Sequence, residues 1–225
     1  MLKAIIFDCD GVIADTEPIH MAAFERVLAE EGITLTQEDY FAHYLALDDR
    51  GCFTRALAGR GKLTAEQLSE MIRRKAEYVE PAMRAQLRIL PGAAEFIRLA
   101  SGVYPLAVAS GALRTEIDLV LKYGDLREHF RVIVSAEDVE RSKPHPDPFL
   151  KARELLNAGS GDQIEPAECL VIEDSIHGIH AAHQAGMRCL AVSNSYPKEK
   201  LVEANHIVDS LAGVTLSDVQ ALFEA

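Results

Sequence analysis

The chain has 225 residues, which is enough for one full hydrophobic core and a smaller second unit. Its net charge of −12 argues against a surface that binds nucleic acid by neutralising phosphates, and no apolar stretch is long enough to cross a bilayer. We expect a cytoplasmic protein, because Met1-Leu2-Lys3 leads straight into a predicted strand without a secretory signal.

The first predicted strand is followed by two aspartates. The apolar run over residues 4–7 is typical of a buried parallel strand, and Asp8 and Asp10 come directly after it. Residues two apart on an extended segment point the same way, so both carboxylates should emerge at the carboxyl end of a central strand, where open α/β sheets bind ligands. Carboxylates this close require a cation or a shared proton. The pattern predicts a divalent metal site, a nucleophile with its acid/base partner, or both.

The next block, residues 17 to 85, has helical character throughout. Pro18 suits the first turn of a helix that Gly32 ends. Thr64 begins a Thr-Ala-Glu-Gln sequence of capping-box form, which predicts the start of another long helix. No strand-like alternation interrupts the block, so we expect a helical domain over residues 16–87.

From residue 90 onward, strand-like and helix-like segments alternate. Short apolar runs of strand type lie at residues 105–109, 132–134, 169–172, 188–192 and 206–208, with helical stretches at 115–123, 148–157 and 176–185. Such alternation implies a parallel sheet covered on both faces. We therefore expect an α/β fold, a Rossmann-like doubly wound parallel sheet built from residues 1–15 and 88–225, with the inserted α-helical cap domain. Residues 157–168 are expected to form a polar surface loop.

The cysteines and three closely spaced histidines fit structural roles. The cysteines form no Cys-x-x-Cys pair and are expected to be buried, reduced thiols; they are Cys9, Cys52, Cys169 and Cys189. Alternation points Cys9 away from the two aspartates. The histidines lie three residues apart on one predicted helix, so the first and last lie about 120° apart around it. We expect them to lie at a surface or interface rather than on a metal; they are His177, His180 and His183.

Four short segments fall where successive strands should end. They read Asp-Cys-Asp-Gly at residues 8–11, Val-Ala-Ser-Gly at 108–111, Ser-Lys-Pro at 142–144 and Ile-Glu-Asp-Ser at 172–175. In this order they resemble the four motifs of the haloacid dehalogenase superfamily, in the branch with a helical cap inserted after the first motif. The resemblance spans nearly the whole chain.

The resemblance implies a catalytic role for each of the four motifs. Asp8 would be the nucleophile, since a carboxylate can attack a phosphoryl group and hold it as an acyl phosphate. Asp10 would protonate the leaving oxygen and later activate water. Lys143 supplies positive charge, Ser110 is a further catalytic residue, and the backbone at Gly111 and Ala112 would bind the phosphoryl oxygens; these residue types suit the neutralisation that phosphoryl transfer requires.

The same resemblance implies a magnesium site. Its expected ligands are all oxygens: the side chains of Asp8, Glu173 and Asp174 and the backbone carbonyl of Asp10. Hard oxygen ligands around a phosphate fit Mg²⁺. Family dehalogenases lack the second acidic residue of the first motif and need no metal, so the presence of Asp10 and Asp174 favours phosphoryl transfer.

Substrate choice is expected to come from the cap. Arg50 lies where the family places its specificity loop and could grip a second anionic group; the alternative is a helix-start arginine paired with Asp48 or Asp49. Lys75 is a second candidate for substrate binding. Thr16 and His20 lie at the predicted hinge, where the related mutases use a Thr and a His to tune the acid/base residue and cap closure.

Taken together, the sequence predicts a Mg²⁺-dependent phosphatase that acts on a small phosphorylated metabolite, either a sugar phosphate or phosphoglycolate, through a phosphoaspartyl intermediate. The alternative is a phosphoryl transferase similar to β-phosphoglucomutase, although residues 44–50 lack the Val-Ser-Arg-like loop of the mutases. A non-catalytic metabolite-binding protein is the third interpretation. We expect a monomer without nucleic-acid or membrane partners.

Overall fold

The computed structural model describes residues 1–45, 47–61, 63–158 and 163–224. The chain forms two compact units. Residues 1–15 and 88–225 make up the first, here called the core unit, and residues 16–87 make up the second, here called the helical unit. Part of the loop expected over residues 157–168 lies outside the described residues.

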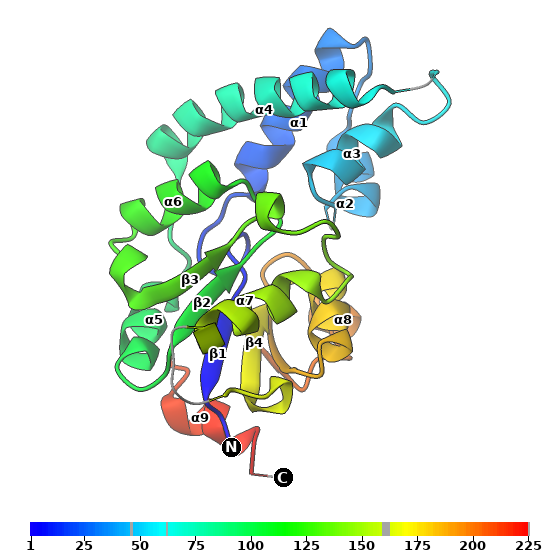
Figure 1. Cartoon of the computed structure of the whole chain (residues 1–225). Helices are drawn as coiled ribbons and strands as arrows, with labels where there is room; N and C mark the ends of the chain where they lie inside the picture. Colours follow the sequence, from blue (N-terminus) through cyan, green and yellow to red (C-terminus); the bar gives the residue numbers. More distant parts are fainter. Residues whose placement is uncertain (46, 62, 159–162, 225) are drawn as a thin grey trace. The chain divides into compact units, whose positions relative to one another are not determined.

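The core unit contains a six-stranded sheet in which every pairing is parallel (Figure 1). Its strand order is β3-β2-β1-β4-β5-β6. The strands are β1 (Ala4–Phe7), β2 (Leu106–Ala109), β3 (Phe130–Val134), β4 (Cys169–Glu173), β5 (Arg188–Val192) and β6 (His206–Val208). The order runs outward in both directions from β1 and β4, which makes the gap beyond their carboxyl ends the switch point of a doubly wound sheet. The predicted fold class is confirmed.

Helices cover both faces of this sheet (Figure 1). All four residues of β1 are buried. Ala4 and Ile6 belong to an apolar cluster shared with helices α7 and α8, whereas the Phe7 ring contacts Phe96 of helix α5, with ring centroids 6.2 Å apart. The helices of the core unit are α5 (Ala93–Ser101), α6 (Arg114–Tyr123), α7 (Asp147–Ala158), α8 (Ile176–Gln184) and α9 (Leu216–Ala221), with 3₁₀ turns at Arg127–His129, Ala136–Asp138, Pro166–Glu168 and Lys198–Lys200.

The described part of the helical unit consists of helices and connecting loops, as predicted. Its helices are α1 (Glu17–Glu30), α2 (Gln37–His43), α3 (Asp49–Ala56) and α4 (Ala65–Gln86). Thr64 makes the predicted capping box with Gln67 at the start of α4. Gly32 follows α1 with a φ of 68°, a left-handed conformation that glycine adopts without strain. Apolar residues from all four helices form the core of this unit.

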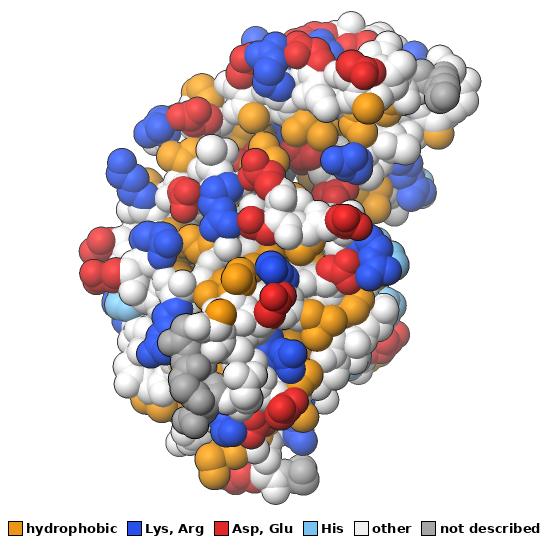
Figure 2. Space-filling model, in the orientation of Figure 1, with side chains coloured by type: hydrophobic (Ala, Val, Ile, Leu, Met, Phe, Trp, Pro, Cys, Tyr) orange, Lys and Arg blue, Asp and Glu red, His pale blue; other side chains and the backbone are white. Residues whose placement is uncertain are grey.

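Charges of both signs lie on the surface, and the cysteines lie in the interior. Lys and Arg side chains are interspersed with Asp and Glu on the face shown in Figure 2. In the part of the chain that the structure describes, no helix is both long and apolar enough to cross a membrane. All four cysteines are buried and free, as expected for packing residues.

Candidate active site

The register of the sheet brings the first and last motifs together. Phe7 of β1 pairs with Ile172 of β4, and the Asp8 amide donates a hydrogen bond to the Ile172 carbonyl at 2.9 Å. The next residues along the two strands, Asp8 and Glu173, therefore lie side by side at the switch point. One ligand atom from each of Asp8, Glu173 and Asp174 lies within 4.8 Å of the others.

Lys143 joins two of these carboxylates. Its Nζ lies 2.8 Å from Oδ1 of Asp8 and 2.7 Å from Oε1 of Glu173. The three side chains are nearly withdrawn from solvent, with exposed fractions of 11% for Lys143, 11% for Asp8 and 0% for Glu173. The structure therefore places the lysine of the third motif on the carboxylates of the first and fourth.

Burial and charge shift the pKa of both groups at the centre of this cluster. Burial raises the pKa of Asp8 to about 7; Lys143 opposes this rise, and the negative charges of Glu173 and Asp10 add to it. Burial lowers the pKa of Lys143, but the attraction of Asp8 and Glu173 is larger and leaves that pKa above its usual value. Lys143 is therefore a cation, and Asp8 is a carboxylate whose charge depends on its partners.

Glu173 is held by both of its carboxylate oxygens. Oε1 pairs with Lys143, and Oε2 accepts hydrogen bonds at 2.9 Å from the amides of Asp174 and Ser175 and from the Ser175 hydroxyl. Gly178 of α8 leaves the space for this carboxylate, because a Cβ at that position would lie 1.8 Å from the Glu173 Cδ. Glu173 is thus fixed in place before any ligand binds.

Asp10 and Ser110 form a separate contact. Asp10 leads into a turn in which the Gly11 amide donates to the Ala14 carbonyl at 2.9 Å. The Ser110 hydroxyl lies 3.4 Å from Oδ2 of Asp10, a long hydrogen bond, and accepts one from the Ala112 amide at 3.1 Å. Ser110 is 2% exposed and is followed by Gly111. The second motif therefore lies beside the second aspartate, while the first aspartate faces Lys143.

Two residues of this site were missed by sequence reasoning. Asn194 and Ser195, in the loop after β5, contact the Gly11 carbonyl and the Asp174 carboxylate, respectively. Their Ser-Asn-Ser-Tyr-Pro context is that of an ordinary turn. Only the pairing of β5 beside β4 brings them to the site.

The predicted residues of the helical unit fall into two groups. Thr16 and His20 lie at the start of α1 and are both buried. Arg50 is exposed in the first turn of α3. Of the two acidic residues in its alternative interpretation, Asp48 accepts a hydrogen bond from the Gly51 amide at 2.8 Å and Asp49 pairs with a different cation.

That different cation is Lys75. Its Nζ lies 2.5 Å from Oδ1 of Asp49 and 4.6 Å from the centre of the Phe24 ring, and the residue is only 1% exposed. Lys75 was expected to bind substrate, but within the helical unit its ammonium is buried and neutralised by Asp49.

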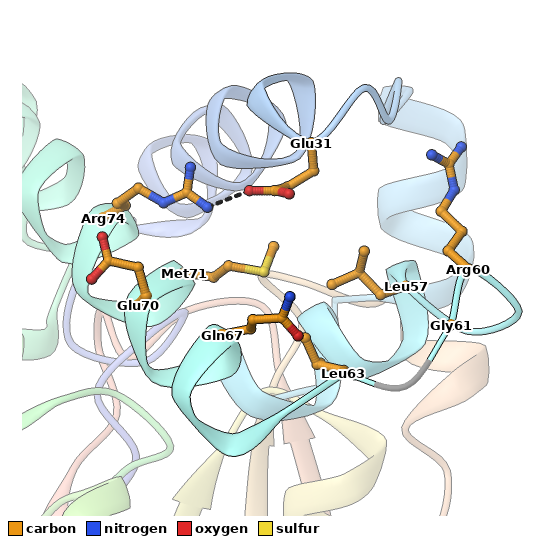
Figure 3. A pocket seen from close by; sticks show the side chains of 9 residues that line it. All are labelled: Glu31, Leu57, Arg60, Gly61, Leu63, Gln67, Glu70, Met71 and Arg74. Atoms are coloured by element: carbon orange, nitrogen blue, oxygen red, sulfur yellow. Dashed lines mark hydrogen bonds and ion pairs between the residues drawn. The ribbon is translucent and has the colours of Figure 1, made fainter.

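A pocket of about 480 Å³ in the helical unit is distinct from these residues (Figure 3). Leu57, Leu63 and Met71 supply apolar surface, and the ion pair between Glu31 and Arg74 lies in its wall. None of the predicted substrate-binding residues is among the side chains that line it.

The carboxylate cluster fits a divalent cation. Asp8, Glu173 and Asp174 offer only oxygen atoms, and Lys143 offsets only part of their negative charge. Of the three histidines of α8, His180 pairs with Glu203 at 3.0 Å, and His183 lies 3.4 Å from the Asn205 side chain in an exposed position.

Comparison with known proteins assigns most of the chain to one family. The family model described as haloacid dehalogenase-like hydrolase matches residues 5–192. The fructose-1-phosphate phosphatase YqaB of Escherichia coli is 32% identical over 192 residues, which are 84% of this chain and 95% of YqaB.

Two solved structures extend the comparison. CbbY from Rhodobacter sphaeroides in complex with phosphate has a TM-score of 0.85 at 27% identity, covering 98% of this chain and all of CbbY. β-Phosphoglucomutase from Clostridium difficile has a TM-score of 0.85 at 26% identity, covering 99% and 97% of the two chains.

Proposed function

The chain belongs to the haloacid dehalogenase-like hydrolases and is a phosphoric monoester hydrolase, and we propose that it dephosphorylates a small sugar phosphate with Asp8 as nucleophile and Mg²⁺ as cofactor. The observation that carries this proposal is the buried cluster of Asp8, Glu173 and Asp174 at the switch point of the sheet, in which Lys143 contacts Asp8 and Glu173. The phosphatase YqaB among the relatives supports the reaction class, and together with the family match it favours an enzyme over a non-catalytic binding protein.

In the proposed reaction, an oxygen of Asp8 attacks phosphorus and the bond from phosphorus to the leaving oxygen breaks. Asp10 donates its proton to that oxygen, so the product leaves as a neutral alcohol. Water then attacks the phosphoaspartyl group while Asp10 takes the water proton, which releases phosphate and restores Asp8. The separate location of Asp10 beside Ser110 supports this division of labour.

Charge neutralisation is divided between the cation and the protein. Mg²⁺, when bound, would offset the charge of the phosphoryl group and of the carboxylates. We assign its ligands to Asp8, Asp174 and the Asp10 carbonyl. Glu173, also expected as a ligand, is assigned to holding Lys143, because both of its oxygens already have partners. Lys143 favours the ionised, nucleophilic form of Asp8, and Ser110 with the Gly111 and Ala112 backbone would bind the phosphoryl oxygens.

For the substrate, we assign the second anionic contact to Arg50, since it is exposed whereas Lys75 is buried and paired. Thr16 and His20 remain assigned to the hinge. A cytoplasmic location is supported by the four reduced cysteines, and a monomer without nucleic-acid or membrane partners is retained from the sequence.

The test is release of inorganic phosphate from a panel of phosphorylated metabolites that includes fructose 1-phosphate and phosphoglycolate, with Mg²⁺ and after treatment with EDTA. We expect turnover of at least one sugar phosphate, loss of turnover with EDTA, and none in Asp8→Asn. Full activity of Asp8→Asn would refute the nucleophile. Arg50→Ala should raise KM for the preferred substrate and leave p-nitrophenyl phosphate unaffected, while Arg55→Ala serves as a control from the same helix.

The mutase remains a second candidate because of the structural similarity to β-phosphoglucomutase over nearly the whole chain. Incubation of β-glucose 1-phosphate with a trace of glucose 1,6-bisphosphate separates the two reactions. Formation of glucose 6-phosphate without free phosphate would replace the phosphatase by the mutase.

A further inference from the structure

The loop after β5 contacts the ends of two other strands. The side-chain amide of Asn194 donates a hydrogen bond to the Gly11 carbonyl at 2.8 Å, in the turn that follows Asp10. The hydroxyl of the next residue, Ser195, donates a hydrogen bond to Oδ2 of Asp174. Two adjacent residues thus connect the turn after β1 to the carboxylate after β4.

The packing at this point leaves little room for movement. A Cβ at Gly11 would lie 1.8 Å from Oδ2 of Asp174 and 2.8 Å from Oγ of Ser195. Gly11 also has a φ of 72°, which other residues rarely adopt. Asp174 itself is 4% exposed. The carboxylate is therefore confined by the Gly11 backbone, and the Ser195 hydroxyl selects which way its oxygens point.

We propose that Ser195 is a positioning residue for the metal-binding carboxylate of Asp174, a role that rests on the magnesium site of the proposed function. A neutral hydroxyl can fix the rotation of the carboxylate about its last bond without removing its negative charge. Partners that orient a metal ligand in this way contribute about 10- to 100-fold to metal affinity. Asn194 contributes indirectly, since its contact with Gly11 anchors the loop.

The alternative is that the Ser195 contact only closes the loop. A purely structural contact would lower stability when removed and leave metal affinity unchanged. A positioning contact would weaken Mg²⁺ binding by the folded protein. Metal affinity, measured without any substrate, separates the two.

The experiment is calorimetric titration of the full chain with Mg²⁺, alongside denaturation with urea. We expect Ser195→Ala to bind Mg²⁺ about 10- to 100-fold more weakly than wild type, and Ser195→Thr, which retains the hydroxyl, to restore affinity. Ser193→Ala is the matched control, because that hydroxyl lies in the same loop but contacts Asp209 at 3.3 Å in an exposed position. It should bind like wild type.

Unchanged Mg²⁺ affinity in Ser195→Ala would overturn the inference, whatever its stability. If Ser195→Ala does not fold, Ser195→Cys provides the same comparison with a weak donor of similar size, and wild-type affinity in that variant would overturn the inference equally. Absence of Mg²⁺ binding by wild type would refute the metal part of the proposed function and this inference with it. Wild-type binding with an unaffected variant refutes the inference alone.

Discussion

Gly178→Ala should have two opposite effects on stability. Alanine favours the helix more than glycine does, but its Cβ would collide with Glu173 of the site. Gly178 lies in the first turn of α8, where its amide donates to the Ser175 hydroxyl at 3.0 Å. Replacing a helical glycine by alanine ordinarily stabilises a protein by about 0.5–1 kcal/mol. Here the added Cβ would lie 1.8 Å, 1.9 Å and 2.3 Å from Cδ, Oε1 and Oε2 of Glu173. No side chain tolerates such separations, so either Glu173 or the helix must move.

The magnitude follows from these two opposing effects. Overpacking a buried position costs about 1–3 kcal/mol, which offsets the gain from helix preference and leaves a net loss of up to about 2.5 kcal/mol. For a chain of this length, Tm should fall by about 2–4 °C per kcal/mol. Activity should fall further than stability explains, because a displaced Glu173 releases Lys143, which it holds at 2.7 Å.

Urea denaturation and kcat/KM for phosphate release, both at saturating Mg²⁺, measure these effects. Gly102→Ala is the control, because its Cβ would meet only the Leu99 carbonyl at 3.6 Å. If the added methyl group collides with Glu173, Gly178→Ala should cause almost no loss of stability when Glu173 is also replaced by alanine. A Gly178→Ala variant as stable and as active as wild type would refute the reasoning.

Three further predictions concern charges. Lys143→Met should lower kcat/KM about 10²–10³-fold, whereas Lys151→Met, which removes an exposed ion pair, should not; equal effects would contradict the assigned role. In metal-free protein, the pKa of Asp8 is raised from 3.8 to about 7, so between these pH values the native state retains a proton that the unfolded state has lost. Asp8 therefore contributes stability that is fully present below about pH 4 and is lost as the pH rises toward 7. Urea denaturation should therefore show Asp8→Asn gaining stability relative to wild type over that interval, and a constant difference would contradict the shift. Lys75→Met should destabilise the protein by about 2–3 kcal/mol, less than the 3–5 kcal/mol typical of a fully buried pair because Asp49 is 18% exposed; a higher KM with unchanged stability would instead make Lys75 a substrate ligand.

Most of the fold was readable from the sequence because its strands are short, apolar and separated by strong turn signals. The bounds of β1, β5 and β6 are those predicted. β2 begins after Pro105, which has no amide hydrogen for the ladder. β3 begins earlier than predicted, at Phe130, because an edge strand tolerates the exposed Arg131 that interrupts its apolar pattern.

The residue types of the site were also determined by the sequence alone. Two aspartates after a strand predict a metal site or a nucleophile with its partner, and the serine, lysine and acidic pair after later segments carry the family resemblance that implies phosphoryl transfer. The partner of each residue was decided only by the tertiary structure. Sequence reasoning did not pair Lys143 with Asp8 and Glu173, or Lys75 with Asp49, because each pair joins residues at least 26 positions apart.

The same limit explains Asn194 and Ser195. Their residue types are those of any turn, and their contacts with Gly11 and Asp174 arise from the parallel pairing of β4 with β5. Sequence pattern reports which chemistry a chain carries, since that depends on residue type and local spacing. Strand register and the space left by single glycines decide which carboxylate contacts a cation and which hydroxyl orients that carboxylate. Both are properties of the folded chain.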